Sequence, residues 1–161
     1  MIKLSTERTF RQTPGVHFAD ISIPGSNGCD LVEHSGPSVS PPNGVLGLPQ
    51  WYVHRHQTDN NRVIKGYRLF ELFNARWEDP HWFVFLSESS GALEIPPGCY
   101  HRSYSGLEGS LLLNHAVRDS LYDENTEFFP KYVPWSFLIN PCYHSCDAQS
   151  VHHFITTGEL L

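Results

Sequence analysis

Apolar and polar residues follow a period of two in short runs rich in Val, Ile, Phe, Tyr and Trp. This pattern is typical of strands that bury one face, whereas the 3.6-residue period of an amphipathic helix is weak almost everywhere. Many short strands of this kind predict a sandwich or a barrel. The predicted strands lie at residues 16–23, 29–34, 50–57, 62–65, 67–74, 81–86, 92–95, 99–104 and 110–117.

Prolines and glycines, twelve of each, separate these runs. Residues 24–28 (PGSNG) predict a loop, and residues 36–43, which contain three prolines, predict irregular backbone. Residues 96–98 (PPG) predict a sharp turn. The alternation is lost in residues 119–133, which we interpret as a helical turn or an ordered loop, and a last strand is expected at 151–156.

Length and composition favour one domain over residues 1–161, because 161 residues with 40% hydrophobic side chains suffice for a single core. We expect a core at about 50–117, an N-terminal arm at 1–49 and a C-terminal extension at 118–161. The formal net charge is -6 and no Lys/Arg cluster occurs, so we expect no nucleic-acid partner. Without a signal peptide or a membrane-length apolar run, we expect no membrane partner, a cytoplasmic location and four reduced cysteines.

Two histidines, His54 and His56, lie within the strand predicted at residues 50–57. Because side chains alternate faces along a strand, both imidazoles should project to the same side and share a metal or a small ligand. A pair of this kind also occurs on ordinary half-exposed strands, so its meaning depends on a partner elsewhere in the chain.

Residues 91–101 (GALEIPPGCYH) provide such a partner. Two prolines stiffen the turn and Gly98 permits a positive φ, so the turn holds His101 in a defined position. The alternative is a well-made hairpin in which this histidine is incidental.

Together, residues 54–66 (HRHQTDNNRVIKG) and residues 91–101 resemble the two motifs of the cupin superfamily. The resemblance spans about residues 50–117. It implies an all-β fold, a single double-stranded β-helix or jelly-roll barrel with the three histidines facing into its mouth. It also implies a homodimer, in which N-terminal strands extend the sheet of the partner.

Residues 118–128 (RDSLYDENTEF) narrow the resemblance. They are similar to the segment after the last barrel strand in dTDP-4-dehydrorhamnose 3,5-epimerases and in dTDP-4-keto-6-deoxyhexose 3,4-ketoisomerases, the WxcM-like group. This resemblance implies an isomerase or epimerase of a nucleotide sugar that requires no cofactor. Its catalytic residues would be His54, His56 and His101, with a barrel histidine as general base next to a carbonyl.

The same resemblance implies a set of substrate-binding residues. Arg62 and Lys65 lie near the place of a lysine in the epimerases, and Tyr122 belongs to the acidic segment. Apart from the resemblance, Tyr104 offers an aromatic ring that either stacks on a sugar or a base or belongs to the core. Asn114 stands where the epimerases have their acid, a tyrosine. Because asparagine cannot deliver a proton as tyrosine does, a ketoisomerase is favoured over a double epimerase.

Two other functions remain open. The three histidines also fit a divalent metal (Fe, Mn, Ni or Zn), which predicts a metal-dependent oxygenase or isomerase of a small molecule. Metal cupins usually carry a glutamate four or five residues after the second histidine, where this chain has Asn60 and Asn61, and Glu71 is the substitute on the next strand. The third hypothesis is a non-catalytic protein that binds a small ligand in the barrel.

Overall fold

The computed structural model describes residues 1–134 and 140–161, so residues 135–139 of the predicted C-terminal extension lie outside the described residues. Strands dominate these ranges, and the predicted all-β class is confirmed. The two helices are α1 (Glu124–Glu127) and α2 (Ala148–Thr157), and within the described ranges no helix is long and apolar enough to cross a membrane. The strands are β1 (Lys3–Ser5), β2 (Arg8–Thr13), β3 (Val16–Asp20), β4 (Gly28–His34), β5 (Ser38–Ser40), β6 (Tyr52–Val53), β7 (Gln57–Phe73), β8 (His81–Ser87), β9 (Ala92–Ile95), β10 (Tyr100–Arg118) and β11 (Cys142–His144).

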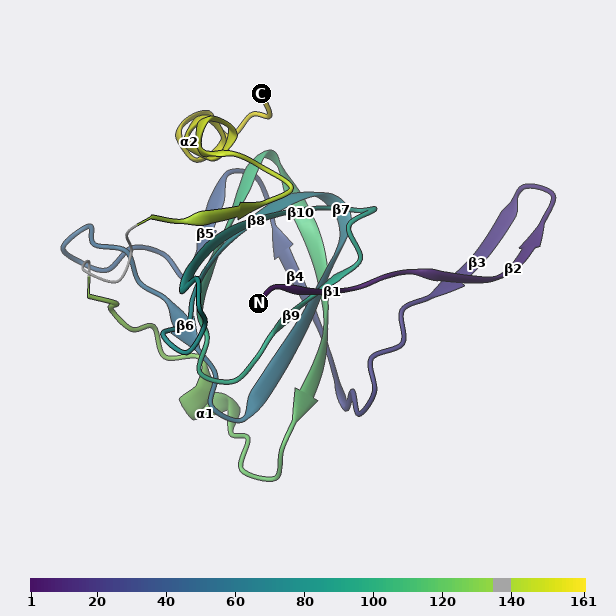
Figure 1. The fold of residues 1–161 in the computed structure, drawn as a ribbon, viewed down its shortest axis with the longest axis horizontal. Coiled ribbons are helices and arrows are strands. Elements are labelled where there is room, and N and C mark those ends of the chain that lie inside the picture. Colours follow the sequence, from purple (N-terminus) through teal and green to yellow (C-terminus); the bar gives the residue numbers. More distant parts are fainter. Residues whose placement is uncertain (135–139) are drawn as a thin grey trace.

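Two long antiparallel strands, β7 and β10, run side by side through a curled nine-stranded sheet (Figure 1). The first part of β7 pairs with β9 and its last part pairs with β8. On its other side β10 pairs with β4, β5 and β6. Strand β1 continues the sheet beyond β9, and β11 lies parallel to β8. The sheet therefore curls around a central space, as the barrel prediction requires.

Glycines let the two long strands bend without ending. Gly66 has φ +80° and Gly109 has φ +70°, and the register between β7 and β10 shifts at this point. A Cβ on Gly109 would lie 2.1 Å from the carbonyl oxygen of His34, so only glycine fits there. At each bend the sequence pattern predicted two separate strands, one before the glycine and one after it. The structure instead has one continuous strand in each case.

Apolar side chains on the inner face of the curl form the main core. Burying one such side chain fully is worth about 1.5–3 kcal/mol relative to exposing it, so this cluster is what holds the two halves of the sheet together. The cluster consists of Val63, Phe70, Leu72, Val84, Leu86, Leu93, Ile95, Cys99 and Leu112.

The strand predicted at residues 151–156 is wrong, because this segment belongs to α2. The Asp147 side chain caps the first turn, and Gly158 ends the helix in the left-handed conformation. Val151 and Phe154, three residues apart, are both buried against the barrel. Caps and a three-residue spacing thus override the strand preference of the β-branched residues.

The strand predicted around the two histidines is also largely wrong, since only β6 forms there and residues 54–56 leave the sheet. The His54 carbonyl accepts a hydrogen bond from Gly98 N at 2.7 Å, in the Pro-Pro-Gly turn. The Arg55 amide donates to the Glu127 carboxylate at 2.7 Å. These bonds replace a regular ladder, so the alternation of side chains does not hold across the histidine pair.

Strands β2 and β3 form a separate two-stranded hairpin that projects from the body of the molecule (Figure 1). An ion pair between Arg8 and Asp20 at 2.6 Å joins its two ends. Phe10 and Val16 on this hairpin are 58% and 50% exposed. The predicted N-terminal arm is therefore of mixed character, because β1, β4 and β5 in the same range belong to the barrel sheet.

Candidate active site

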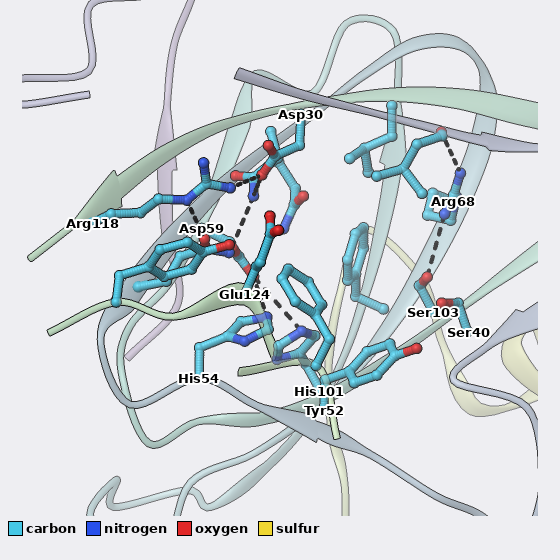
Figure 2. A pocket seen from close by; sticks show the side chains of 18 residues that line it. Asp30, Ser40, Tyr52, His54, Asp59, Arg68, His101, Ser103, Arg118 and Glu124 are labelled. Atoms are coloured by element: carbon cyan, nitrogen blue, oxygen red, sulfur yellow. Dashed lines mark hydrogen bonds and ion pairs between the residues drawn. The ribbon is translucent and has the colours of Figure 1, made fainter. Parts of the chain in front are cut away.

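A cavity of about 390 Å³ lies inside the curled sheet (Figure 2). Strands β4, β7 and β10 line it, and the segment around α1 covers one end. Its size is within the range of small-molecule sites, and it holds several buried polar groups. This cavity is the candidate active site.

His54, Asp59 and His101 meet in the cavity, and all three are buried. The Nε2 atoms of both histidines lie 3.6 Å from Asp59 Oδ2. On their other side, His54 Nδ1 donates to the carbonyl oxygen of Glu127 at 3.1 Å, and His101 Nδ1 donates to that of Cys99 at 3.2 Å. Because a carbonyl only accepts, each Nδ1 carries a hydrogen, and in the neutral form of each ring the unprotonated nitrogen is Nε2.

Burial lowers the pKa of His101 to about 4, and the nearby His54 lowers it further, against the opposing effect of Asp59. His101 is therefore neutral at neutral pH, and its Nε2 is an acceptor. When both rings are neutral, two unprotonated nitrogens and a carboxylate face one another. Acceptors in this arrangement bind a proton, a cation or the hydroxyl of a substrate.

Two amides hold Asp59 in place. Its Oδ1 accepts from Gln57 Nε2 at 2.6 Å and from Asn114 Nδ2 at 2.8 Å, which leaves Oδ2 toward the histidines. Asn114 is itself fixed, since its Oδ1 accepts from the Asn60 amide at 2.8 Å. Asn114, expected to bind substrate, lines the cavity and also positions the carboxylate.

Glu127 supports His54 from outside the cavity. It is 4% exposed, and its Oε2 lies 3.7 Å from His54 Nδ1. The Asp123 side chain caps α1 by accepting from the Asn125 amide at 2.9 Å, and this helix ends at Glu127. A carboxylate next to Nδ1 stabilises the imidazolium that forms when Nε2 takes up a proton.

His56 does not join the other two histidines, and the expectation that all three converge is wrong for this residue. Its Nδ1 lies 3.0 Å from Asp119 Oδ2, and its side chain is 31% exposed. It lines a separate surface cavity beside Arg55 and Thr126. The physical reason is the irregular backbone at residues 54–56, which turns His56 away from the face that His54 occupies.

Three other expected substrate-binding residues do not line the cavity. Arg62 is paired with Glu7, and Lys65 is exposed to solvent. Tyr104 lies on the opposite face of β10, where its hydroxyl donates to Glu71 at 2.7 Å. Glu71 consequently cannot replace the expected glutamate ligand, because it too faces away from the cavity.

Tyr122 lines the cavity at the end where the segment around α1 lies, as a substrate-binding role requires. The Arg118 guanidinium carbon lies 4.4 Å from the centre of its ring. Arg118 in turn pairs with Asp30 at 2.5 Å. Phe128, which is 43% exposed, adds a second aromatic ring at this end. This rim is suited to stacking against a planar group of a ligand.

Sequence reasoning missed Asp59 and Glu127. Asp59 lies three residues after His56, whereas the cupin motif predicts its carboxylate four or five residues after the second histidine. Counting from His54 gives an interval of five residues and finds Asp59. Glu127 is brought to His54 only by the folding of the segment after β10, and nothing in the local sequence signals that contact.

No family model matches this chain, and no curated protein matches it. Solved structures do match. The TDP-quinovose 3,4-ketoisomerase WlaRB from Campylobacter jejuni has a TM-score of 0.59 at 16% identity, covering 86% of this chain and 98% of its own. QdtA, a sugar 3,4-ketoisomerase from Thermoanaerobacterium thermosaccharolyticum in complex with TDP, has a TM-score of 0.58 at 16% identity. The match covers 80% of this chain and 86% of QdtA.

A third similar structure is the dTDP-4-dehydrorhamnose 3,5-epimerase from Sulfolobus tokodaii, with a TM-score of 0.50 at 18% identity, covering 76% of this chain and 69% of its own. At identities this low, the likeness concerns the fold. The barrel that the two sequence motifs predicted is confirmed by it. The chain therefore has the cupin-type fold that these sugar ketoisomerases and this epimerase share.

Proposed function

We propose that this protein is an isomerase or epimerase of a keto-deoxysugar nucleotide, with His54 as its general base. The observation that carries the proposal is the buried cluster of His54, Asp59 and His101, with both Nε2 atoms 3.6 Å from the carboxylate. Similar structures named as sugar 3,4-ketoisomerases, one of them in complex with TDP, support a nucleotide sugar as substrate.

The proposed reaction moves a carbonyl between neighbouring carbons of the sugar. His54 Nε2 takes the proton from C3, next to the C4 carbonyl, and the electron pair of the broken C–H bond gives an enediolate. Return of that proton to C4, with transfer of the O3 hydroxyl proton to O4, gives the 3-keto sugar and leaves C4 as an alcohol. The bare Nε2 of His101 accepts the hydrogen bond of the O3 hydroxyl, and Glu127 stabilises the His54 imidazolium.

Ketoisomerisation is favoured over double epimerisation by the role of Asn114. Its amide is engaged with Asp59 and with the Asn60 backbone, and it cannot donate a proton to carbon. A single histidine that shuttles one proton between adjacent carbons needs no second acid.

Deuterium exchange tests this function. Protein incubated with dTDP-4-keto-6-deoxyglucose in deuterated water should place deuterium on the sugar, as measured by NMR. The His54→Asn substitution should lower the exchange rate by about 10²–10⁴-fold, because it removes the base. His56→Asn is the matched control, and it should keep the wild-type rate because His56 lies outside the cavity.

Exchange that survives His54→Asn, or that is lost only in His56→Asn, would contradict the assignment of the base. Wild-type protein that exchanges no label would contradict the proposed reaction.

A metal-dependent reaction is the second candidate, and a specific observation favours it. One ligand atom from each of His54, Asp59 and His101 lies within 4.8 Å of the others. Two bare imidazole nitrogens and a carboxylate form a donor set that suits Fe, Mn, Ni or Zn, so the residues fit the group. In this case His54, Asp59 and His101 would be the ligands, and the ion would act as a Lewis acid on a substrate oxygen.

Metal binding is tested by titrating untagged protein with each of these four ions and measuring the heat of binding. We expect one equivalent to bind if this candidate is right, and Asp59→Asn to weaken that binding about tenfold or more, because it removes the anionic ligand. His56→Asn should leave the affinity unchanged. Binding that His56→Asn weakens and Asp59→Asn does not would exclude the His54, Asp59 and His101 site.

A homodimer is also part of the proposal. The β2–β3 hairpin projects from the body and exposes Phe10 and Val16, as a segment that packs on a second copy would (Figure 1). The resemblance to cupins, whose N-terminal strands extend the sheet of a partner, supports the same assembly.

A further inference from the structure

The described side chains around His54 and His101 are mostly acceptors. Each neutral histidine presents an unprotonated Nε2, and Asp59 presents a carboxylate oxygen. The amides of Gln57 and Asn114 donate to Asp59 at 2.6 Å and 2.8 Å. When a base removes a proton next to a carbonyl, negative charge develops on the carbonyl oxygen, and a donor placed there lowers the barrier. A donor for that oxygen has to come from another side chain of the cavity.

Tyr52 carries a hydroxyl group next to both histidines. It lines the cavity, and its ring centre lies 6.3 Å from that of His54 and 6.1 Å from that of His101. The two imidazole centres are 4.9 Å apart, so the three rings form a compact triangle. Within the described residues, the contacts of the Tyr52 side chain are ring contacts, and its hydroxyl makes no hydrogen bond.

Strand pairing explains why the Tyr52 side chain enters the cavity. Tyr52 in β6 lies directly opposite His101 in β10. Residues directly opposite each other in an antiparallel pair project from the same face of the sheet. Because the tyrosine side chain is the longer of the two, its hydroxyl extends past the His101 imidazole. Figure 2 shows the Tyr52 ring beside His101, extending toward the side of the cavity where Ser40 and Ser103 lie.

Phe128 holds the Tyr52 ring without using its hydroxyl. The two rings meet edge to face, with their centres 6.0 Å apart and an angle of 77° between their planes. The Phe128 ring also lies 4.9 Å from that of His54. Edge-to-face pairs at these distances are favourable. The tyrosine is therefore positioned by its ring, and its hydroxyl stays available for a ligand.

The three side chains match three neighbouring positions of the proposed substrate. This step rests on the proposed function, in which His54 Nε2 acts on the hydrogen of C3 and His101 Nε2 accepts from the O3 hydroxyl. The C4 carbonyl is then close to both histidines, because C3 and C4 are bonded to each other. Tyr52 contacts both imidazole rings, so its hydroxyl is suited to reach O4.

We propose that Tyr52 is a further catalytic residue, whose hydroxyl donates a hydrogen bond to the C4 carbonyl oxygen of the substrate. This bond strengthens as His54 takes the proton from C3 and O4 gains negative charge. Tyr52 keeps its own proton and forms no covalent bond in this step.

The Tyr52→Phe substitution tests the proposal, because it removes the hydroxyl and keeps the ring contacts. Conversion of dTDP-4-keto-6-deoxyglucose, followed by NMR, should show kcat lowered by about 10²–10³-fold, the range for the loss of one such donor. KM should change much less, because the bond is strongest in the transition state. Tyr100→Phe is the matched control. It removes the hydroxyl of a tyrosine that packs on Phe73 outside the cavity, and it should keep the wild-type kcat.

Infrared spectroscopy reports on the hydrogen bond itself. Substrate labelled with ¹³C at C4 and bound to His54→Asn protein, which lacks the base, should show the stretching band of its carbonyl. Adding Tyr52→Phe should move this band to higher wavenumber, because a carbonyl that accepts a hydrogen bond is polarised and vibrates at lower wavenumber. Loss of a residue that only packs against the substrate would leave the band in place. The thermal midpoint of Tyr52→Phe should equal that of the wild-type protein, because the hydroxyl has no partner among the described residues.

Each other outcome has a separate meaning. Wild-type kcat in Tyr52→Phe, with activity lost in His54→Asn, would overturn the role of Tyr52 and leave the proposed function intact. A raised KM at unchanged kcat, or a carbonyl band that Tyr52→Phe does not move, would overturn that role as well. Wild-type protein that converts none of the keto sugar would contradict the proposed function, and the role of Tyr52 with it.

Discussion

The chemistry of the site depends on which ring nitrogen each histidine leaves bare. Backbone carbonyls fix His54 and His101 through Nδ1, so both Nε2 atoms point at Asp59. His34 follows the same logic with different partners: its Nδ1 donates to Ser105 at 2.8 Å and its Nε2 accepts from Arg68. Burial lowers the pKa of both His34 and His101 to about 4, so these two side chains are neutral imidazoles at neutral pH, and their protonation would disturb a buried network.

The neutral state of His34 makes the free energy of unfolding depend on pH. The pKa of His34 is about 4 in the folded protein, against an ordinary value of 6.5, so between these values the unfolded chain binds a proton that the folded protein does not. The free energy of unfolding should therefore be highest above pH 6.5 and fall as the pH drops toward 4, by up to about 3 kcal/mol for this residue. His101 adds to the loss in the same direction.

Urea unfolding at pH 5 and pH 7.5 measures the effect. His34→Gln should show a smaller difference between the two pH values than the wild-type protein, because the glutamine does not titrate. An unchanged difference would show that His34 does not contribute.

At the scale of elements, the barrel depends on bends within β7 and β10. The bend in β10 comes at Gly109, where the backbone is in the left-handed region and packs against the His34 carbonyl. Gly98 has a similar φ of +80°, yet a Cβ there would have nothing within 4 Å. A side chain at Gly98 would therefore meet only backbone strain, whereas a side chain at Gly109 would meet backbone strain and a steric clash.

Replacing each glycine by alanine tests this difference. Gly98→Ala should cost only the left-handed strain, about 1–2 kcal/mol in the free energy of unfolding. Gly109→Ala adds a clash with backbone atoms and should cost about 4 kcal/mol or more. Urea denaturation measures both, and equal losses would mean that the strand bends without this close contact.

The sequence predicted most barrel strands, because half-buried strands show a period of two that survives in each segment. It failed where tertiary contacts decide the backbone. Residues 54–56 follow strong strand formers, yet they lie outside the sheet. Their backbone hydrogen bonds are made with the Gly98 amide and the Glu127 carboxylate instead of a neighbouring strand. His54 and His101 could be found because the motifs place them, whereas Arg68 reads as an ordinary strand residue and only the folded barrel shows that it is buried.

At the scale of the whole molecule, the β2–β3 hairpin is the feature that the barrel does not explain. It forms its own two-stranded sheet and exposes apolar side chains. Isolated two-stranded hairpins are at best marginally stable in water. Contact with a second copy would bury its apolar side chains and stabilise it.

The predicted dimer can be tested by one substitution on this hairpin. Val16→Asp should convert a dimer to a monomer in light scattering after size exclusion, because a charge in an apolar interface is costly. Leu121→Asp, at a 70% exposed position on the body, is the matched control and should leave the dimer intact. A wild-type monomer, or a dimer that survives Val16→Asp, would contradict the proposed assembly.

The pairing of β7 with β10 also bears on how the protein folds. Asp59 and Asn114, which meet in the site, are 55 positions apart in sequence, and their contact forms only when the two long strands have paired. Closing such a separation is slow, so the site should assemble late in folding. A ligand of the cavity then recognises only the finished barrel. It should stabilise the protein by slowing its unfolding, while the rate of refolding stays unchanged.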